Sequence, residues 1–448
     1  MSRSQFLAVI LAGLLLRAIA LPGPGTGDLT VFKVWTYNAA RHGVADMYGT
    51  SGPADQWHPV EYAGVVGYVV YPPLALYQLA AAGQLYWLWS HHHFPNTVAL
   101  NAFVKLPAFL AEIGLVLLLF GLTRKRLGTA AARWSVAAYW INPAALINAS
   151  VLGYLDAQFA LPAVAAVAAA AFGWPTIAGA LVAGSILTKP QGLFIAPAVA
   201  LALWTAGTPD RRLTRFAWAT LGGSIVTAVV LGPIAMAGGL PHLLFAMGRG
   251  AHHDMVSANA CNLWWIVGYV LRVRYSAADL GLWAAITAPA KILGIPRIIE
   301  IGYPDPLTIG IVLTVAATAW ALWTARKRDD LWLLAGVGGF TIHAYATLSA
   351  QVHENHMFGA VPLLVLAAAG RSAFRPILLT VSAIVALNLN LFYGFGDGVG
   401  YGLPRSLTVI DATVLLSVVN CAALCWHAAV LRRESSKAVE YRRTSAPA

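Results

Sequence analysis

The chain alternates long apolar segments with short polar breaks, and this pattern constrains its fold more than any other feature. Hydrophobic residues make up 59% of the 448 residues and charged residues only 10%, with a mean hydropathy of +0.68. Ordinary soluble domains carry about 25% charged residues. Since a membrane-spanning helix needs roughly 20 mostly apolar residues, we expect an all-α, polytopic transmembrane helix bundle of about twelve spans. The expected spans lie near residues 5–21, 98–123, 134–152, 155–173, 175–189, 192–206, 216–237, 305–325, 331–350, 357–370, 376–392 and 407–430.

Basic residues gather after every second expected span. Such residues concentrate in the cytoplasmic loops of membrane proteins, so both termini are expected in the cytoplasm. The net charge of +11 then reflects topology and does not indicate nucleic-acid binding. The basic residues in question are Arg124, Lys125, Arg126, Arg133, Arg211, Arg212, Arg215, Arg326, Lys327, Arg328, Arg371, Arg375, Arg432, Arg433, Lys437, Arg442 and Arg443, together with Arg3.

Two long segments, at about 22–97 and 238–304, fall on the external side of this topology. They contain the moderately apolar pieces "YPPLALYQLAAAGQLYWLW" and "NACNLWWIVGYVLRV". Because Trp and Tyr settle at membrane interfaces, we expect interfacial helices there. Residues 1–430 are expected to form a single transmembrane domain, and 431–448 a basic cytoplasmic tail.

The unusual polar residues all fall on the expected external face, whereas the cytoplasmic turns hold little besides Arg and Lys. A charge at mid-membrane costs on the order of 2.5–3.5 kcal/mol, so such residues often mark a site. The convergence on one face is the main functional signal. The external clusters contain Asp28, Tyr71, Asp156, Lys189, Gln191, Arg249, His252, His253, Asp254, His353, Glu354 and His356.

Several of these residues also have structural interpretations. Asp28 is suited to capping the helix that follows it, since Asp is a preferred N-cap. Lys189 could extend its ammonium toward water along an apolar stem, or form an ion pair with Asp156. Lys105 and Glu112, seven residues apart in the second span, could form a structural pair or belong to a transport pathway.

The stretch "QVHENHMF" at 351–358 places two imidazoles and a carboxylate between apolar runs. His353 and His356 could bind a metal, but they lack the spacing of HExxH and no third ligand is evident. They could also be satisfied polar groups at an interface. Anion recognition is favoured, because His donates to phosphate oxygens beside Arg or Lys.

No P-loop, GxSxG, dinucleotide-binding or CxxC motif occurs, which argues against a cytoplasmic nucleotide donor. An activated lipid carrier is the energy source available on an external face.

Taken in order, these motifs resemble the polytopic GT-C glycosyltransferases. The resemblance is to the endoplasmic-reticulum glucosyltransferases of asparagine-linked glycosylation and to bacterial relatives of the GPI mannosyltransferases. The matching residues are Asp28, Tyr71 to Leu74, Gly153 to Asp156, Lys189 to Gln191, Arg249-Gly250, Asn262 to Trp265 and His353-Glu354. The chain departs from the family where Gly153 to Asp156 lacks a Gln and where residues 353–356 read HENH.

The resemblance implies a polyprenyl-phosphate sugar donor, inversion at the anomeric carbon and a base in the first external loop. We therefore expect a hexosyltransferase, mannosyl or glucosyl, acting on a lipid-linked glycan or polymer at the periplasmic face of a bacterial inner membrane, without a cofactor. A transporter or lipid flippase is the main alternative, and a non-catalytic assembly subunit is another. The expected roles are base for Asp28, phosphate binding for Lys189, Arg249, His353 and His356, and support for Tyr71, Asp156, Gln191, Asp254 and Glu354, with Glu354 orienting an imidazole.

Overall fold

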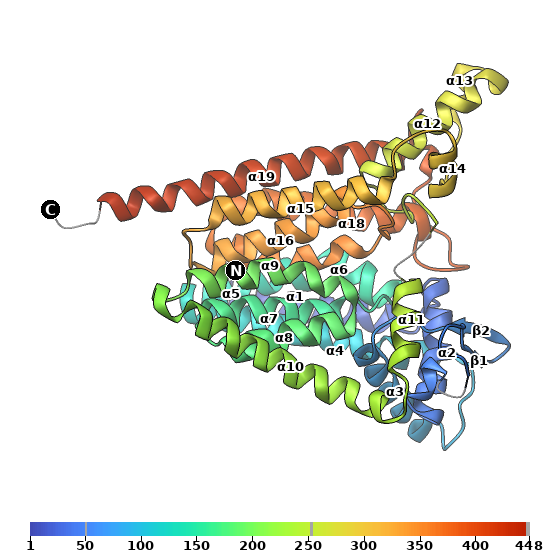
Figure 1. Cartoon of the computed structure of the whole chain (residues 1–448), viewed down its shortest axis with the longest axis horizontal. Coiled ribbons are helices and arrows are strands. Elements are labelled where there is room, and N and C mark those ends of the chain that lie inside the picture. Colours follow the sequence, from blue (N-terminus) through green and yellow to red (C-terminus); the bar gives the residue numbers. More distant parts are fainter. Residues whose placement is uncertain (50–51, 251–253, 445–448) are drawn as a thin grey trace.

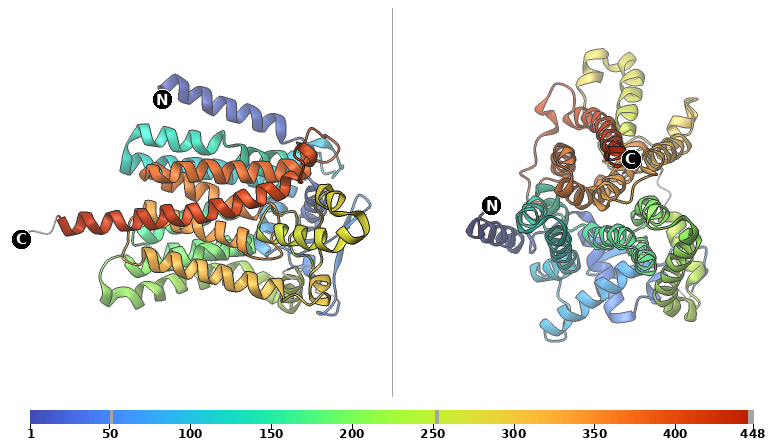
Figure 2. Two further views of the ribbon diagram at one scale, coloured as in Figure 1. Left: turned by 90° about the horizontal axis from the view of Figure 1, so that it is seen from above. Right: turned by 90° about the vertical axis from the view of Figure 1, so that its left-hand side faces the viewer.

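The computed structural model describes residues 1–49, 52–250 and 254–444, and over these residues the chain forms a bundle of long helices lying side by side (Figure 1, Figure 2). Seven described helices are long and apolar enough to cross a membrane, and four shorter apolar helices lie among them. The expected polytopic helical bundle is confirmed. The bundle helices are α1 (Arg3–Ala20), α4 (Val98–Leu127), α5 (Thr129–Trp140), α7 (Asp156–Ala171), α8 (Pro175–Thr188), α9 (Ala196–Thr205), α10 (Arg212–Met236), α15 (Pro306–Ala325), α16 (Leu331–Leu348), α17 (Ala360–Gly370), α18 (Arg375–Tyr393) and α19 (Ala412–Thr444).

Helix α16 lies in the interior of the bundle and α1 at its edge. In the most apolar window of α16, 83% of residues are buried, compared with 11% in α1. Large apolar side chains such as Leu11 on α1 and Val229 on α10 remain exposed. A soluble protein rarely leaves so much apolar surface uncovered, so these faces are suited to contact lipid.

The segments between α1 and α4 and between α10 and α15 gather at one end of the bundle, here called the α2–α3 end (Figure 1). The start of α1 and the last turns of α19 lie at the other end, here called the termini end. The elements of the α2–α3 end are α2 (Gly27–His42), η1 (Asp46–Tyr48), β1 (Pro59–Tyr62), β2 (Val65–Tyr68), α3 (Pro73–Trp89), α11 (Leu240–Gly250), α12 (Leu263–Leu280), α13 (Leu282–Thr287) and α14 (Ile295–Glu300).

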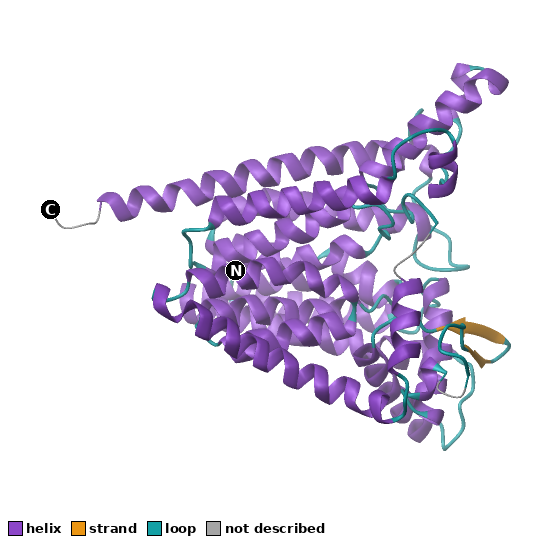
Figure 3. Cartoon of the chain, in the orientation of Figure 1, coloured by secondary structure: helices purple, strands orange, loops and turns teal. Residues whose placement is uncertain are grey.

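The two apolar pieces singled out in these segments form helices α3 and α12, as expected. The hairpin β1–β2 was not expected, and Figure 3 shows it as the pair of strands beside α2. The strands pair in antiparallel register, Pro59 with Tyr68 and Tyr62 with Val65. Its turn residues Ala63 and Gly64 both have positive φ, the conformation that two-residue hairpin turns require.

The third expected span, 134–152, is broken. Helix α5 ends at Trp140, a short helix, α6 (Pro143–Ala145), begins after two intervening residues, and a π-helical turn, η2 (Leu146–Val151), follows. Asn142 caps the N-terminus of α6, because its side chain accepts a hydrogen bond from the Ala144 amide at 3.0 Å. Broken helices persist at membrane depth only where other groups satisfy the freed backbone atoms.

Lys105 of α4 provides hydrogen bonds to some of the freed carbonyl groups at this break. Its Nζ donates to Ser150 O and Val151 O, both at 2.9 Å, at the end of η2. It also donates to Ala20 O at 3.3 Å and Gly23 O at 3.0 Å, where α1 ends. The lysine is fully buried. It therefore fixes the end of α1 to the break in the third span.

Glu112 pairs with Arg17 of α1 and not with Lys105. The Arg17 Nη2 and Nε atoms lie 2.8 and 3.0 Å from the two Glu112 carboxylate oxygens, and both side chains are buried. The guanidinium carbon also lies 3.7 Å from the centre of a Trp140 ring. Lys105 and Glu112 therefore hold neighbouring helices together. Their charges do not support the transport-pathway interpretation.

The last expected span, 407–430, is displaced. Helix α18 ends at Tyr393 and α19 runs without interruption from Ala412 to Thr444. Residues 394–411 consequently form a third segment at the α2–α3 end. The shorter helical turns of the chain are η3 (Pro190–Ile195), η4 (Pro209–Arg211), η5 (His356–Gly359), η6 (Ser372–Phe374) and η7 (Arg405–Leu407).

The topology expected from the basic loops predicts which thiols an impermeant reagent reaches. Tyr401, in the third segment, is 84% exposed, and Thr208, at the termini end, is also exposed. In a cysteine-free background and intact cells, Tyr401→Cys should react with a membrane-impermeant maleimide, while Thr208→Cys should react only after permeabilisation. Labelling of Thr208→Cys in intact cells would contradict the orientation.

The Arg17–Glu112 pair predicts a large loss of stability when one partner is removed. Removing half of a buried pair typically costs about 3–5 kcal/mol, whereas replacing both partners with apolar residues is often tolerated. Glu112→Ala should lower the apparent melting temperature in detergent, and Arg17→Met with Glu112→Leu should recover most of it. Arg297→Ala, which removes an exposed ion pair with Glu300, should change it little; a similar loss there would count against a special role for the buried pair.

Candidate functional site

A buried ion pair lies where α7 begins and α8 ends. The Lys189 ammonium contacts a carboxylate oxygen of Asp156, and both side chains are at most 2% exposed. Asn148 donates to the other oxygen of Asp156 at 2.9 Å. Of the two interpretations left open for Lys189, the ion pair is confirmed and extension into water is wrong. Burial by itself would lower the pKa of Lys189, but the adjacent Asp156 raises it, so the lysine stays charged.

Tyr71 lies over this pair. Its ring centre is 5.7 Å from Lys189 Nζ, within the range of cation–π attraction. Burial raises the pKa of Tyr71 to about 12 against the opposing effect of Lys189. The phenol is therefore neutral at physiological pH and can donate a hydrogen bond.

Asp28 lies in the first turn of α2, near the ion pair but outside it. Thr26 occupies the N-cap position, so the capping interpretation of Asp28 is wrong. The side chain is solvent-accessible. Desolvation by the surrounding protein nevertheless raises its pKa above the ordinary range; Lys189 opposes this, whereas Asp156 and Asp397 add to it. Asp28 is thus an accessible carboxylate with increased basicity.

Glu354 lies in the turn between α16 and α17. It accepts a 2.5 Å hydrogen bond from the Tyr154 hydroxyl and bonds to neither imidazole, so the expectation that it orients a histidine is wrong. Burial raises the pKa of Glu354 to about 7, although the Tyr154 bond opposes this. Tyr154 belongs to the Gly153 to Asp156 motif, so this hydrogen bond brings that motif into contact with the HENH turn.

His356 is held by other residues. Its Nδ1 lies 2.9 Å from the Tyr345 hydroxyl and its Nε2 lies 2.8 Å from Gln191 Nε2. The His353 ring centre lies 5.2 Å from that of His356, and its backbone bridges to Ala258. The HENH turn is thereby fixed against the elements that carry Lys189 and the second long segment.

Arg249 is exposed at the end of α11, with its guanidinium 5.7 Å from the Phe245 ring centre. The next residue, Gly250, lies close to Val70, the neighbour of Tyr71: a Cβ on Gly250 would lie 2.9 Å from Val70 Cβ and 3.2 Å from Val70 O. Asp254 is exposed, and its contribution is a backbone bond to Ile295 at 2.9 Å. No contact joins the Asp254 carboxylate to the other candidates in the described ranges; His252 and His253 lie outside those ranges.

Sequence reasoning missed Tyr154, Tyr345 and Asn148 as partners of the candidate residues. Two of these could have been recognised from the sequence, because Tyr154 lies inside the Gly153 to Asp156 motif and Asn148 is a polar amide within an apolar span. Tyr345 lies in α16 without any distinguishing pattern. Within the described part of the chain, no three His, Cys, Asp or Glu residues are grouped as ligands for a metal ion.

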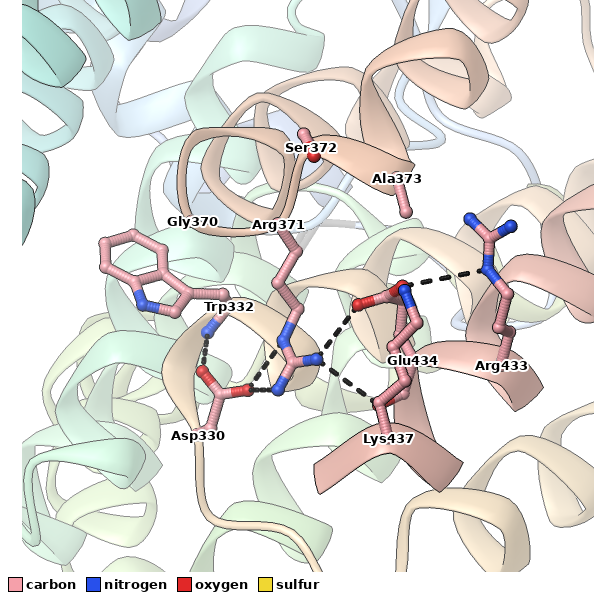
Figure 4. A pocket seen from close by; sticks show the side chains of 9 residues that line it. All are labelled: Asp330, Trp332, Gly370, Arg371, Ser372, Ala373, Arg433, Glu434 and Lys437. Carbon is pink, nitrogen blue, oxygen red and sulfur yellow. Dashed lines mark hydrogen bonds and ion pairs between the residues drawn. The ribbon is translucent and has the colours of Figure 1, made fainter. Parts of the chain in front are cut away.

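A recess at the termini end contains a separate cluster of charges (Figure 4). Arg371 contacts Asp330 at 2.6 Å and Glu434 at 3.1 Å, and Lys437 contacts Glu434 at 2.9 Å. These contacts link α19 to the loops that precede α16 and follow α17. The cluster lies at the end opposite to Asp28 and holds the helices together.

The sequence matches no protein-family model and no curated protein. Among solved structures, it is similar to the crystal structure of ArnT from Cupriavidus metallidurans bound to undecaprenyl phosphate, with 14% identity over 97% of this chain and 78% of that chain and a TM-score of 0.50. The chain has the GT-C fold. An oligosaccharyltransferase from Archaeoglobus fulgidus, tethered to an acceptor peptide, also matches, with 15% identity over 100% of this chain and 58% of that chain and a TM-score of 0.40.

The buried Glu354 predicts a pH dependence of stability. The folded protein retains the Glu354 proton up to about pH 7, whereas an ordinary glutamate loses it near 4.5. The folded state binds more protons between these values, so stability falls as pH rises through this window, by about 3 kcal/mol at full ionisation. Glu354→Gln should melt near the wild-type temperature at pH 5 and above it at pH 8. Parallel pH profiles of the two proteins would contradict this.

Proposed function

We propose that this chain is an integral membrane glycosyltransferase that moves a hexose from a polyprenyl-phosphate carrier to a hydroxyl acceptor. The proposal rests on the environment of Asp28. Its carboxylate is accessible, has a raised pKa and lies near the buried Asp156–Lys189 pair, in a bundle of GT-C fold. The fold neighbour ArnT was crystallised with undecaprenyl phosphate, which supports a polyprenyl-phosphate carrier here.

Two apolar grooves flank α8, the helix that Lys189 directly follows. One, of about 820 Å³, lies between α8, α9 and α10, and the other, of about 470 Å³, lies between α3, α4, α7 and α8. Apolar grooves among spanning helices can take isoprenoid chains, because their walls offer van der Waals contacts and bury no unpaired polar group. Their position supports a lipid carrier whose phosphate reaches the α2–α3 end.

In the proposed step, an acceptor hydroxyl oxygen attacks the anomeric carbon on the face opposite to the phosphate. The new C–O bond forms as the bond to the phosphate oxygen breaks, and that oxygen keeps the electron pair. Asp28 takes the hydroxyl proton as general base. The products are the glycosylated acceptor and polyprenyl phosphate, with the anomeric configuration inverted.

The leaving phosphate needs positive and hydrogen-bonding groups around it. Lys189, Arg249, His353 and His356 are proposed for this role. Because Lys189 shares its charge with Asp156, the exposed Arg249 would carry the larger part of phosphate recognition. Tyr71 and Gln191 would support them, Tyr71 over Lys189 and Gln191 against His356, whereas Asp254 would contribute through its backbone.

The proposed sugar is mannose or glucose and the proposed acceptor a lipid-linked glycan or polymer. Residues 1–430 would act as one transmembrane catalytic domain and 431–448 as a cytoplasmic tail. With the basic loops in the cytoplasm, Asp28 would face the periplasm of a bacterial inner membrane.

The proposal predicts the behaviour of Asp28→Asn. Full-length protein in nanodiscs would be supplied with polyprenyl-phosphate [¹⁴C]mannose or [¹⁴C]glucose and octyl glycoside acceptors. Loss of a general base typically lowers the rate by a factor on the order of 10²–10⁴, so transfer by Asp28→Asn should fall by this amount. Stability should change little, because Asp28 lies outside the N-cap position and its carboxylate has no hydrogen bond or ion pair among the described residues. The raised pKa of Asp28 should also place the acidic limb of wild-type kcat/KM above about pH 3.9, the ordinary aspartate value.

Asp55→Asn is the matched control, since it makes the same change at an exposed aspartate of the same segment. It should transfer sugar at the wild-type rate. Near-normal transfer by Asp28→Asn would remove Asp28 from the role of base and return that assignment to the exposed Asp254.

A further inference from the structure

The third segment at the α2–α3 end begins with the glycine-rich stretch "GFGDGVGYG", residues 394–402. Gly394, Gly396, Gly398 and Gly400 all have positive φ, between 58° and 115°. Side-chain-bearing residues rarely adopt this region. The alternation of glycines therefore gives the stretch a tightly folded path, with Asp397 at its centre.

This path docks against the segment that leads into α2. The Asp397 amide donates to Gly25 O at 2.7 Å, and a Cβ on Gly396 would lie only 2.8 Å from the same oxygen. On its other side, Gly25 meets Leu152, because a Cβ on Gly25 would lie 2.7 Å from Leu152 O. The entry to α2 is thus held between the broken third span and the Asp397 loop.

The docking brings two carboxylates to one edge of the site. Asp397 Oδ2 lies 3.9 Å from the point where a Cβ on Gly27 would stand, and Gly27 is the neighbour of Asp28. Both aspartates are exposed. Among residues 1–49, 52–250 and 254–444, neither carboxylate has a hydrogen bond or ion pair, whereas the nearby Asp156 is bound to Lys189. Asp28 and Asp397 therefore both keep their oxygen lone pairs available.

We propose that Asp397 is an acceptor-binding residue that recognises the hydroxyl adjacent to the one that Asp28 deprotonates. This inference rests on the proposed glycosyl transfer and defines its acceptor as a vicinal diol of a sugar ring, rather than an isolated hydroxyl. A carboxylate accepts a charge-assisted hydrogen bond from each hydroxyl, so two neighbouring carboxylates match two neighbouring hydroxyls. Asp28 removes a proton from one, and Asp397 fixes the orientation of the other.

The test compares sugar transfer with donor hydrolysis in Asp397→Asn. This variant keeps the backbone amide that docks the loop to Gly25. Wild type, Asp397→Asn and the control Asp55→Asn would be assayed at pH 8 with octyl mannoside or octyl glucoside, and without an acceptor, where water attacks the donor. A hydrogen bond to a charged group stabilises a complex more than a hydrogen bond to a neutral one. The acceptor KM of Asp397→Asn should therefore rise by a factor on the order of 10–100. Donor hydrolysis and donor KM should stay at wild-type values.

A second readout is the pH profile of hydrolysis. The pKa of Asp28 is lowered by the charge of Lys189 and raised by the charges of Asp156 and Asp397. Without the Asp397 charge, the acidic limb of hydrolysis in Asp397→Asn should lie at lower pH than in wild type. An unchanged acceptor KM, or an equal loss of transfer and hydrolysis, in Asp397→Asn would each overturn the proposal. Absence of both transfer and hydrolysis in wild type would instead overturn the proposed function.

Discussion

The buried ammonium of Lys105 fixes the geometry on which the rest of the site depends. It binds backbone carbonyls from the end of α1 and from the break in the third span. Helix ends leave such carbonyls without intrahelical partners, and apolar surroundings make that costly. One of the two joined segments continues to Asp28 and the other to Asp156. A single lysine therefore sets the relative position of the accessible and the buried carboxylate.

The two carboxylates have different chemistry because their environments differ. Asp156 is buried against Lys189 and Asn148, so its charge is compensated and it supports the site. Among the residues that the structure describes, Asp28 has no such partner, and desolvation raises its basicity while leaving it accessible. A base needs both basicity and access to the proton that it removes. The division of roles proposed for these residues follows from this contrast.

Sequence patterns predicted which residues gather at the α2–α3 end better than they predicted the partners of those residues. Asp28, Tyr71, Asp156, Lys189 and the HENH turn all lie there, and the Asp156–Lys189 pair was anticipated. The partners of Glu354 and Glu112 were not, since each pairs with a residue far away in the sequence. Asp397 was missed because the expected spans 376–392 and 407–430 left it in the loop between them, where a single Asp among glycines matches no motif.

The sequence by itself determined that this chain is a helical membrane bundle, because the length of each apolar segment and the placement of basic residues are local properties. It could not determine that the third span breaks, that Thr26 and not Asp28 occupies the N-cap position of α2, or that Tyr154 binds Glu354, which is 200 positions away. Those outcomes were decided by tertiary structure, because a buried polar group must find a hydrogen-bond partner and only the packed bundle determines which groups lie within reach.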